Sequence, residues 1–195
     1  MVIKRTIEEK ENLSEEDIRA KLKTLSPILR QEYLENLLSR LNLDPSIKLL
    51  ASRELVELYV RRGLYYNAAK IMESAAISFP SLSVKKDIYK QAGILHLKAG
   101  NFLNAEDCFK KSLENALEKE RPFLRKEFEN IFVAEAEFLE SKGRKQKACE
   151  MYEKILRSDI DEYLKKKISE RLLSLYEKLG KLREYFDLRE SLKRS

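Results

Sequence analysis

Four of the five glycines in this 195-residue chain recur at nearly regular intervals, and this spacing limits the folds that the chain can adopt. Gly63, Gly100, Gly143 and Gly180 are separated by 37, 43 and 37 residues. Each follows a segment, such as LYVRRG or LYEKLG, with apolar residues at helical spacing and a Lys or Arg in its last turn. Glycine adopts the left-handed conformation that ends a helix without steric cost, and cations there offset the negative end of the helix dipole. The pattern therefore predicts a series of helix pairs, each joined by a tight turn.

The remaining composition agrees with an all-helical fold. Strong helix formers (Leu, Glu, Lys, Ala and Arg) dominate, and the chain has only five Gly and four Pro. Ser26 and Asp44 each precede a proline, which is typical of a capping residue followed by the first helical position. Short connections place sequential helices antiparallel. We expect ten helices, at residues 14–25, 27–42, 45–62, 64–79, 84–99, 102–118, 122–142, 145–157, 161–179 and 182–193.

A pattern of small and large residues recurs within these helix pairs. The clearest copy consists of Tyr89, Ala92, Gly93, His96, Ala105 and Phe109, and further partial copies lie in residues 49–82 and 129–162. Small residues let two helices approach closely, and large ones fill the groove beside them. Over roughly residues 45–180, the pattern resembles the tetratricopeptide repeat, W-x2-L-G-x2-Y…A-x3-F…P.

This resemblance implies an all-α fold, a right-handed α-solenoid of about five antiparallel helical hairpins. The 43-residue step between Gly100 and Gly143 predicts a longer first helix or a longer connection near Pro122. The last hairpin is bulky where the repeat is small, which suits a capping unit. The expected units are an N-terminal tail (1–13), a degenerate hairpin (14–43), three repeats (about 45–82, 84–119 and 121–160) and the capping hairpin (161–195).

In stacks of this kind the first helix of each hairpin lines a concave groove where peptides bind. The resemblance therefore implies that the protein is a non-catalytic adaptor or scaffold that binds a segment of another protein. Lys and Arg in the groove would hold carboxylates of an acidic or acidic-hydrophobic segment. The implied groove residues are Arg53, Arg61, Lys90, Ile94, Leu97, Lys98, Val133, Lys167, Arg171 and Lys178.

The sequence shows no recognisable catalytic, cofactor or metal motif. A Gly-rich phosphate loop and a GxSxG nucleophile motif are both missing. The one histidine, His96, is expected to pack in the core, and Cys108 and Cys149 have no CxxC spacing, which favours two buried thiols in a reducing compartment. We therefore expect no enzyme activity, no cofactor and no metal site. With no signal peptide and no membrane-spanning run, we expect a cytoplasmic protein without membrane contact.

Two alternatives remain for the C-terminal end. Residues 163–195 hold ten Lys or Arg and five Asp or Glu, so most of the net charge of +6 lies there. Such a basic end favours contact with an acidic partner, including RNA in a ribosome or another ribonucleoprotein. Alternatively, Tyr185, Leu188 and Leu192 form an apolar face for self-association into a homodimer or larger homo-oligomer.

Overall fold

The computed structural model describes residues 14–40, 42–157 and 160–194, and in this part of the chain the secondary structure is entirely helical. The predicted N-terminal tail, residues 1–13, lies outside the described residues. None of the described helices combines the length and the apolar character that crossing a membrane requires. The helices are Glu15–Thr24 (α1), Pro27–Leu38 (α2), Pro45–Arg61 (α3), Tyr65–Ser78 (α4), Leu82–Lys98 (α5), Phe102–Glu114 (α6), Glu118–Glu120 (η1, a 3-10 turn), Arg121–Ser141 (α7), Lys145–Leu156 (α8), Glu162–Leu179 (α9) and Leu182–Arg194 (α10).

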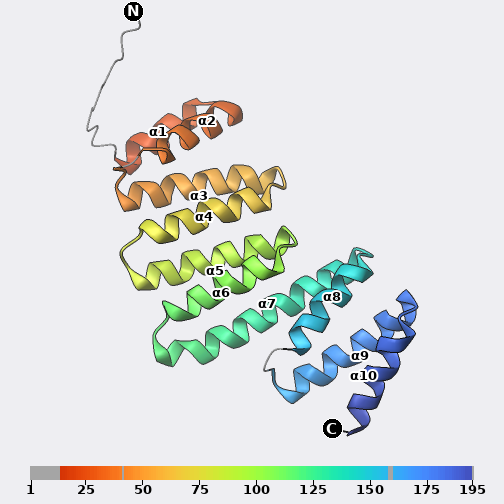
Figure 1. The fold of residues 1–195 in the computed structure, drawn as a ribbon. Coiled ribbons are helices and arrows are strands. Elements are labelled where there is room, and N and C mark those ends of the chain that lie inside the picture. The colour runs from red at the N-terminus through yellow and green to blue at the C-terminus, as the bar shows by residue number, and fades with distance from the viewer. Residues whose placement is uncertain (1–13, 41, 158–159, 195) are drawn as a thin grey trace, which may run out of the picture.

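The helices from α2 to α10 pack mainly against their neighbours in sequence. Figure 1 shows the helices as successive layers from α1 at one end to α10 at the other. The helices α3, α4, α5 and α6 form the most closely packed block. After α6 the stack shifts sideways along α7, so that α8, α9 and α10 form the opposite end of the molecule (Figure 1).

The turns between paired helices have the predicted chemistry. All four turn glycines have a positive φ of 71° to 78°. At Gly63, the amide of Leu64 donates to the carbonyl of Tyr59 (2.8 Å), which closes the last turn of α3 and reverses the chain. The predicted caps are also present, since Ser26 and Asp44 accept hydrogen bonds from the first turns of α2 and α3.

Two helices end earlier than the sequence predicts. The α2 helix ends at Leu38 and the α6 helix at Glu114, where ends at residues 42 and 118 were expected. In α6, the side-chain amide of Asn115 donates to the carbonyl of Lys111 (2.7 Å), and this local bond satisfies the helix end. The η1 turn then leads into α7, whose 21 residues exceed the 17 of α3 and α5. The 43-residue glycine step is thus accommodated by both a longer helix and a longer connection.

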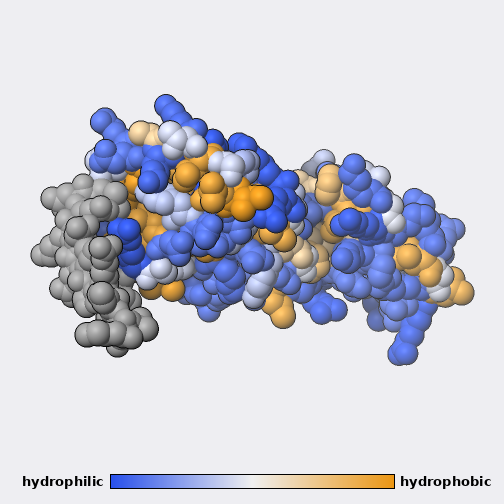
Figure 2. Space-filling model, turned by 90° about the horizontal axis from the view of Figure 1, so that it is seen from above, coloured by the Kyte–Doolittle hydropathy of each residue, from blue (hydrophilic) through white to orange (hydrophobic). Residues whose placement is uncertain are grey.

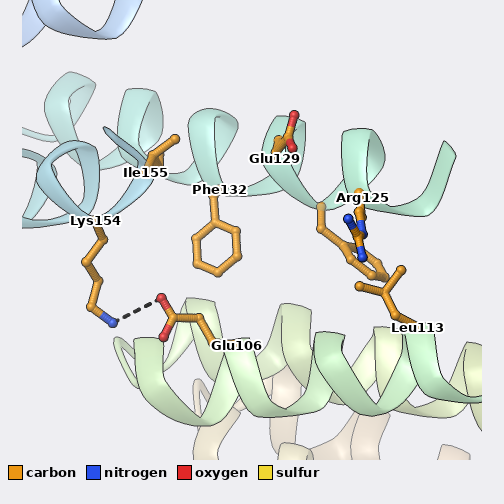
Figure 3. Close-up of a pocket in the computed structure, with 8 residues that line it drawn as sticks. Glu106, Leu113, Arg125, Glu129, Phe132, Lys154 and Ile155 are labelled. Atoms are coloured by element: carbon orange, nitrogen blue, oxygen red, sulfur yellow. Dashed lines mark hydrogen bonds and ion pairs between the residues drawn. The ribbon is translucent and has the colours of Figure 1, made fainter. Parts of the chain in front are cut away.

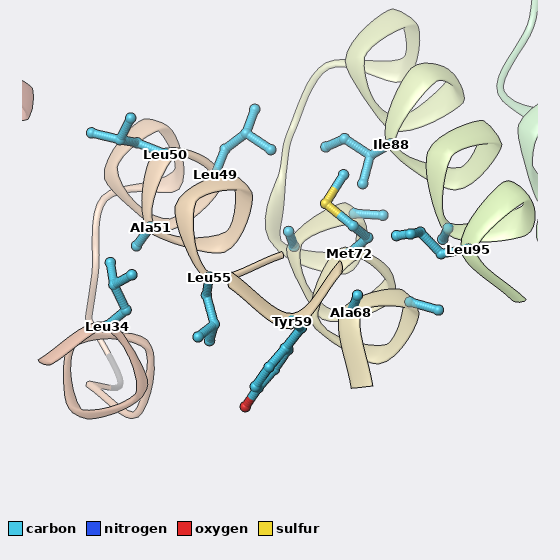
Figure 4. Close-up of a cluster of buried hydrophobic side chains, with 14 of the residues drawn as sticks. Leu34, Leu49, Leu50, Ala51, Leu55, Tyr59, Ala68, Met72, Ile88 and Leu95 are labelled. Atoms are coloured by element: carbon cyan, nitrogen blue, oxygen red, sulfur yellow. The ribbon is translucent and has the colours of Figure 1, made fainter. Parts of the chain in front are cut away.

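The core consists of two hydrophobic clusters. The first extends from α1 to α6 and includes Leu55, Met72 and Ile88. Figure 4 shows Met72 of α4 and Ile88 of α5 pointing toward each other. The second extends from the end of α5 to α10 and includes Phe109 and Tyr152. The alanines at the small positions of the repeat pattern, which are Ala105 and, in the partial copies, Ala68, Ala136 and Ala148, are all fully buried. The small residues therefore occupy the helix interfaces, as expected.

The tightest of these contacts joins α5 to α6 at Gly93. A Cβ placed on Gly93 would lie 2.6 Å from Cε1 of Phe109, closer than real Cβ contacts allow. The ring of Phe109 is 3% exposed and stacks on Phe128 of α7, with ring centroids 4.4 Å apart. It therefore cannot move away without disturbing α7.

We expect Gly93→Ala to lower the free energy of unfolding by about 1–3 kcal/mol, because the overlap with Phe109 outweighs the better helix propensity of alanine. Urea denaturation monitored by circular dichroism measures this change. In a Phe109→Leu background, where the ring is absent, the same substitution should be neutral or stabilising. An equal loss in both backgrounds would show that the ring contact is not the cause.

Candidate binding site

A cleft with a volume of about 290 Å³ lies beside α6 and α7. It lies between α6, α7 and α8, as Figure 3 shows, with Phe132 pointing from α7 toward α6. Concave, mostly apolar openings with a few polar groups are typical of binding sites. The lining residues are Glu106, Leu113, Arg125, Phe128, Glu129, Phe132, Lys154 and Ile155.

The apolar part of the cleft is built on the ring of Phe109. Phe109 stacks on Phe128 and meets Phe132 edge to face, with a centroid distance of 5.5 Å and an interplanar angle of 73°. Phe128 and Ile155 are buried, whereas Phe132 and Leu113 are only partly covered. Because the Phe109–Phe128–Phe132 contacts restrain the rings, the cleft is largely preformed and offers an apolar surface to an incoming side chain.

Charged side chains mark the two ends of the cleft. Lys154 of α8 reaches across the opening to Glu106 of α6, with Nζ 3.2 Å from Oε1, as Figure 3 shows. Arg125 of α7 lies at the other end beside Leu113, and Glu129 lies between Arg125 and Phe132, as Figure 3 shows. Arg125 is exposed and makes no ion pair with any of the described residues. The lining therefore combines apolar surface with charged side chains, an arrangement that suits the binding of a ligand.

Two residues assigned to the concave groove lie instead in the hydrophobic core. Leu97 is 2% exposed and Val133 is 7% exposed, and both belong to the second core cluster. Ile94 is half-buried and packs against the same cluster. Because α7 packs on α5 here, the apolar side chains that the sequence analysis assigned to ligand binding contribute to the hydrophobic core instead. Arg53, Arg61, Lys98 and Lys178 remain exposed.

The other groove cations are paired with carboxylates of α7. Lys90 lies 3.1 Å from Glu127, and the remaining contacts are Lys167 to Glu137 (3.3 Å), Arg171 to Glu137 (3.0 Å) and Arg171 to Glu140 (3.1 Å). The first helices α5, α7 and α9 are thus joined by opposite charges across their common face. A partner could bind these three cations, Lys90, Lys167 and Arg171, only by breaking their ion pairs within the protein.

The residues assigned to self-association mainly pack α10 against the rest of the protein. Tyr185 and Leu188 of α10 pack against the second core cluster, and Leu192 is half-buried. The most exposed apolar side chains of α10 are Leu182 and Phe186, at 63% and 56%. This packing agrees with the capping interpretation of the last hairpin.

The cleft between α6, α7 and α8 is not the largest opening on the described surface, since one lined by Phe123 and Leu124 has a volume of about 470 Å³. The face shown in Figure 2 is mostly hydrophilic, with hydrophobic side chains gathered in separate patches. A second opening of about 450 Å³ contains Glu135 between Lys98 and Arg144. Burial raises the pKa of Glu135, and the two cations oppose this shift.

The chain was compared with models of known protein families and with curated proteins, and it matches none of them.

The raised pKa of Glu135 predicts a pH-dependent stability effect. A carboxyl group whose pKa is higher in the folded state binds its proton more tightly there, so its ionised form destabilises the fold at neutral pH. We expect Glu135→Gln to raise the free energy of unfolding at pH 7 and to lose this advantage as the pH falls through the raised pKa of Glu135 to 4.5, the ordinary Glu value. Urea denaturation at both pH values tests this, with the exposed Glu170→Gln as control. An equal effect of the two substitutions at pH 7 would contradict the prediction.

Proposed function

We propose that the protein is a non-catalytic adaptor that binds a segment of another protein. The observation that carries this proposal is the preformed apolar cleft between α6, α7 and α8, whose lining offers both hydrophobic contact and charged side chains. A partner side chain such as Leu or Phe would fill the space beside Phe132. The exposed guanidinium of Arg125 would pair with a carboxylate of the same segment, so an acidic-hydrophobic segment fits best.

The architecture that we propose for this adaptor is a right-handed, TPR-like α-solenoid of about five hairpins. Its support is the regular series of positive-φ glycines and the close contact of Gly93 with Phe109, at positions of the tetratricopeptide pattern. The shifted third repeat, with its long α7, would open the cleft between two second helices rather than along the first helices. The buried cysteines, which form no disulfide, fit a cytoplasmic location.

Contact with a ribosome or RNA through the basic C-terminal helices has less support. Three of the ten basic side chains in residues 163–195 form ion pairs with more N-terminal helices, namely Lys167 with Glu137, Arg171 with Glu140 and Lys181 with Glu153, so they are already engaged within the fold. Homo-oligomerisation through α10 has less support for the same kind of reason, since Tyr185 and Leu188 are engaged in packing.

The cleft proposal is tested by reversing the charge of Arg125. The Arg125→Glu variant should release a partner recovered by affinity purification from the source cells, with affinity at least tenfold lower, equivalent to about 1.4 kcal/mol. The physical reason is repulsion between the new carboxylate and the acidic segment. Quantitative mass spectrometry of the recovered proteins gives the comparison.

The matched control is Arg183→Glu, an equal charge change on the exposed face of α10. It should retain the partner, and both variants should keep the helical circular dichroism of the native protein. If Arg125→Glu retains every partner that Arg183→Glu retains, the cleft is not the binding site. If neither native protein nor variant recovers a specific partner, the adaptor function itself fails.

A further inference from the structure

Three metal-ligating side chains meet in the core at the closely packed junction of α4, α5 and α6. One ligand atom each from Glu73 of α4, His96 of α5 and Cys108 of α6 lie within 4.8 Å of one another. His96 and Cys108 are 0% and 1% exposed, and the side chain of Glu73 is 19% exposed. These residues are far apart in sequence, so the search for short ligand spacings that predicted no metal site could not detect them.

The histidine of this cluster is incompletely satisfied. Nε2 of His96 lies 2.5 Å from Oε1 of Glu73, but the buried Nδ1 has no hydrogen-bond partner among the described residues. It is the one buried side-chain nitrogen or oxygen in the described part of the chain that lacks a partner. A buried polar atom without a partner is unfavourable, so His96 is the side chain of this cluster that the fold satisfies least.

We propose that Glu73, His96 and Cys108 bind one divalent transition-metal ion, with Zn²⁺ as the ion that fits best. Carboxylate oxygen, imidazole nitrogen and thiolate sulfur are the three ligand types that Zn²⁺ uses in proteins. A carboxylate, a thiolate and a neutral imidazole around a divalent cation give a site without net charge, which is the arrangement that a buried location tolerates. Coordination also occupies a ring lone pair of His96.

The geometry requires only local adjustment. Tetrahedral coordination places such ligand atoms roughly 3.3–3.6 Å apart, so the Glu73–His96 pair must open while Cys108 moves inward. Entry is from the side of Glu73, the most exposed of the three, where Lys70 now holds both carboxylate oxygens at 3.2 Å. Lys70 is 47% exposed in its side chain, so it can swing into solvent as the cation arrives.

The chemistry of Cys108 gives the binding a second signature. A free thiol is largely protonated at neutral pH, whereas the form that binds a metal ion is the thiolate. Binding as a thiolate therefore releases a proton, which makes the affinity increase with pH. The ion would act structurally, since it would link three successive helices that have no covalent connection other than their turns.

The test uses the full-length protein, purified, freed of metal with a chelator and titrated with Zn²⁺ by calorimetry and with Co²⁺ by absorption. We expect one ion per chain, a sulfur-to-cobalt charge-transfer band, and proton release in buffers of different ionisation enthalpy. Cys108→Ala should remove the band and weaken Zn²⁺ binding at least 100-fold, and His96→Gln should also weaken it.

Cys149→Ala is the matched control, because Cys149 is equally buried and contacts Glu153 but has no histidine beside it. It should keep the band and the affinity. The proposal is overturned if the native protein binds no Zn²⁺, if its cobalt complex lacks the sulfur band, or if Cys108→Ala binds as tightly as Cys149→Ala. The first two outcomes are measured on the native protein, so the proposal can be disproved even if a variant fails to fold. None of these outcomes depends on the adaptor function.

Discussion

The contact between the ring of Phe109 and the backbone at Gly93 is the constraint on which the middle of the molecule depends. Because Gly93 has no side chain, α6 approaches α5 closely enough for the ring to be almost fully buried. The outer side of the same ring then carries Phe128 and Phe132 of α7. Gly93 thus lets Phe109 take the position in which it contacts α7, and the cleft lies beside these contacts. A side chain at position 93 would push α6 away from α5, and the aromatic cluster around Phe109 would be displaced with it.

Local backbone chemistry was predictable from the sequence because it depends on a few neighbouring residues. The turn at Gly63 needs a positive φ, and the cap at Asp44 needs a side-chain acceptor before a proline, so both can be read from short segments. The small residue at position 93 was likewise recognisable from its spacing. These features specify helix ends and close approaches, which together give most of the fold.

The site was less predictable because it depends on how far apart and at what offset the hairpins pack. The way α7 packs against its neighbours decides whether Val133 faces solvent or the core, and no local sequence pattern records that packing. The sequence did contain one relevant signal: an acidic stretch containing Glu127 and Glu137 precedes the basic C-terminal end. Opposite charges at adjacent levels of a stack favour pairing within the stack, and Lys90 and Lys167 pair in this way.

Two consecutive residues of α6 connect the two sites proposed for this molecule. Cys108 faces the cluster with Glu73 and His96, whereas Phe109 faces Gly93 and the rings that line the cleft. A cation bound at Cys108 would restrict the rotation and sliding of α6, and the neighbouring ring moves with the same turn of helix. The cleft wall would then be more rigid when the ion is bound, and a rigid wall binds a partner side chain at a lower entropic cost. In this arrangement the ion needs no contact with the partner to strengthen its binding.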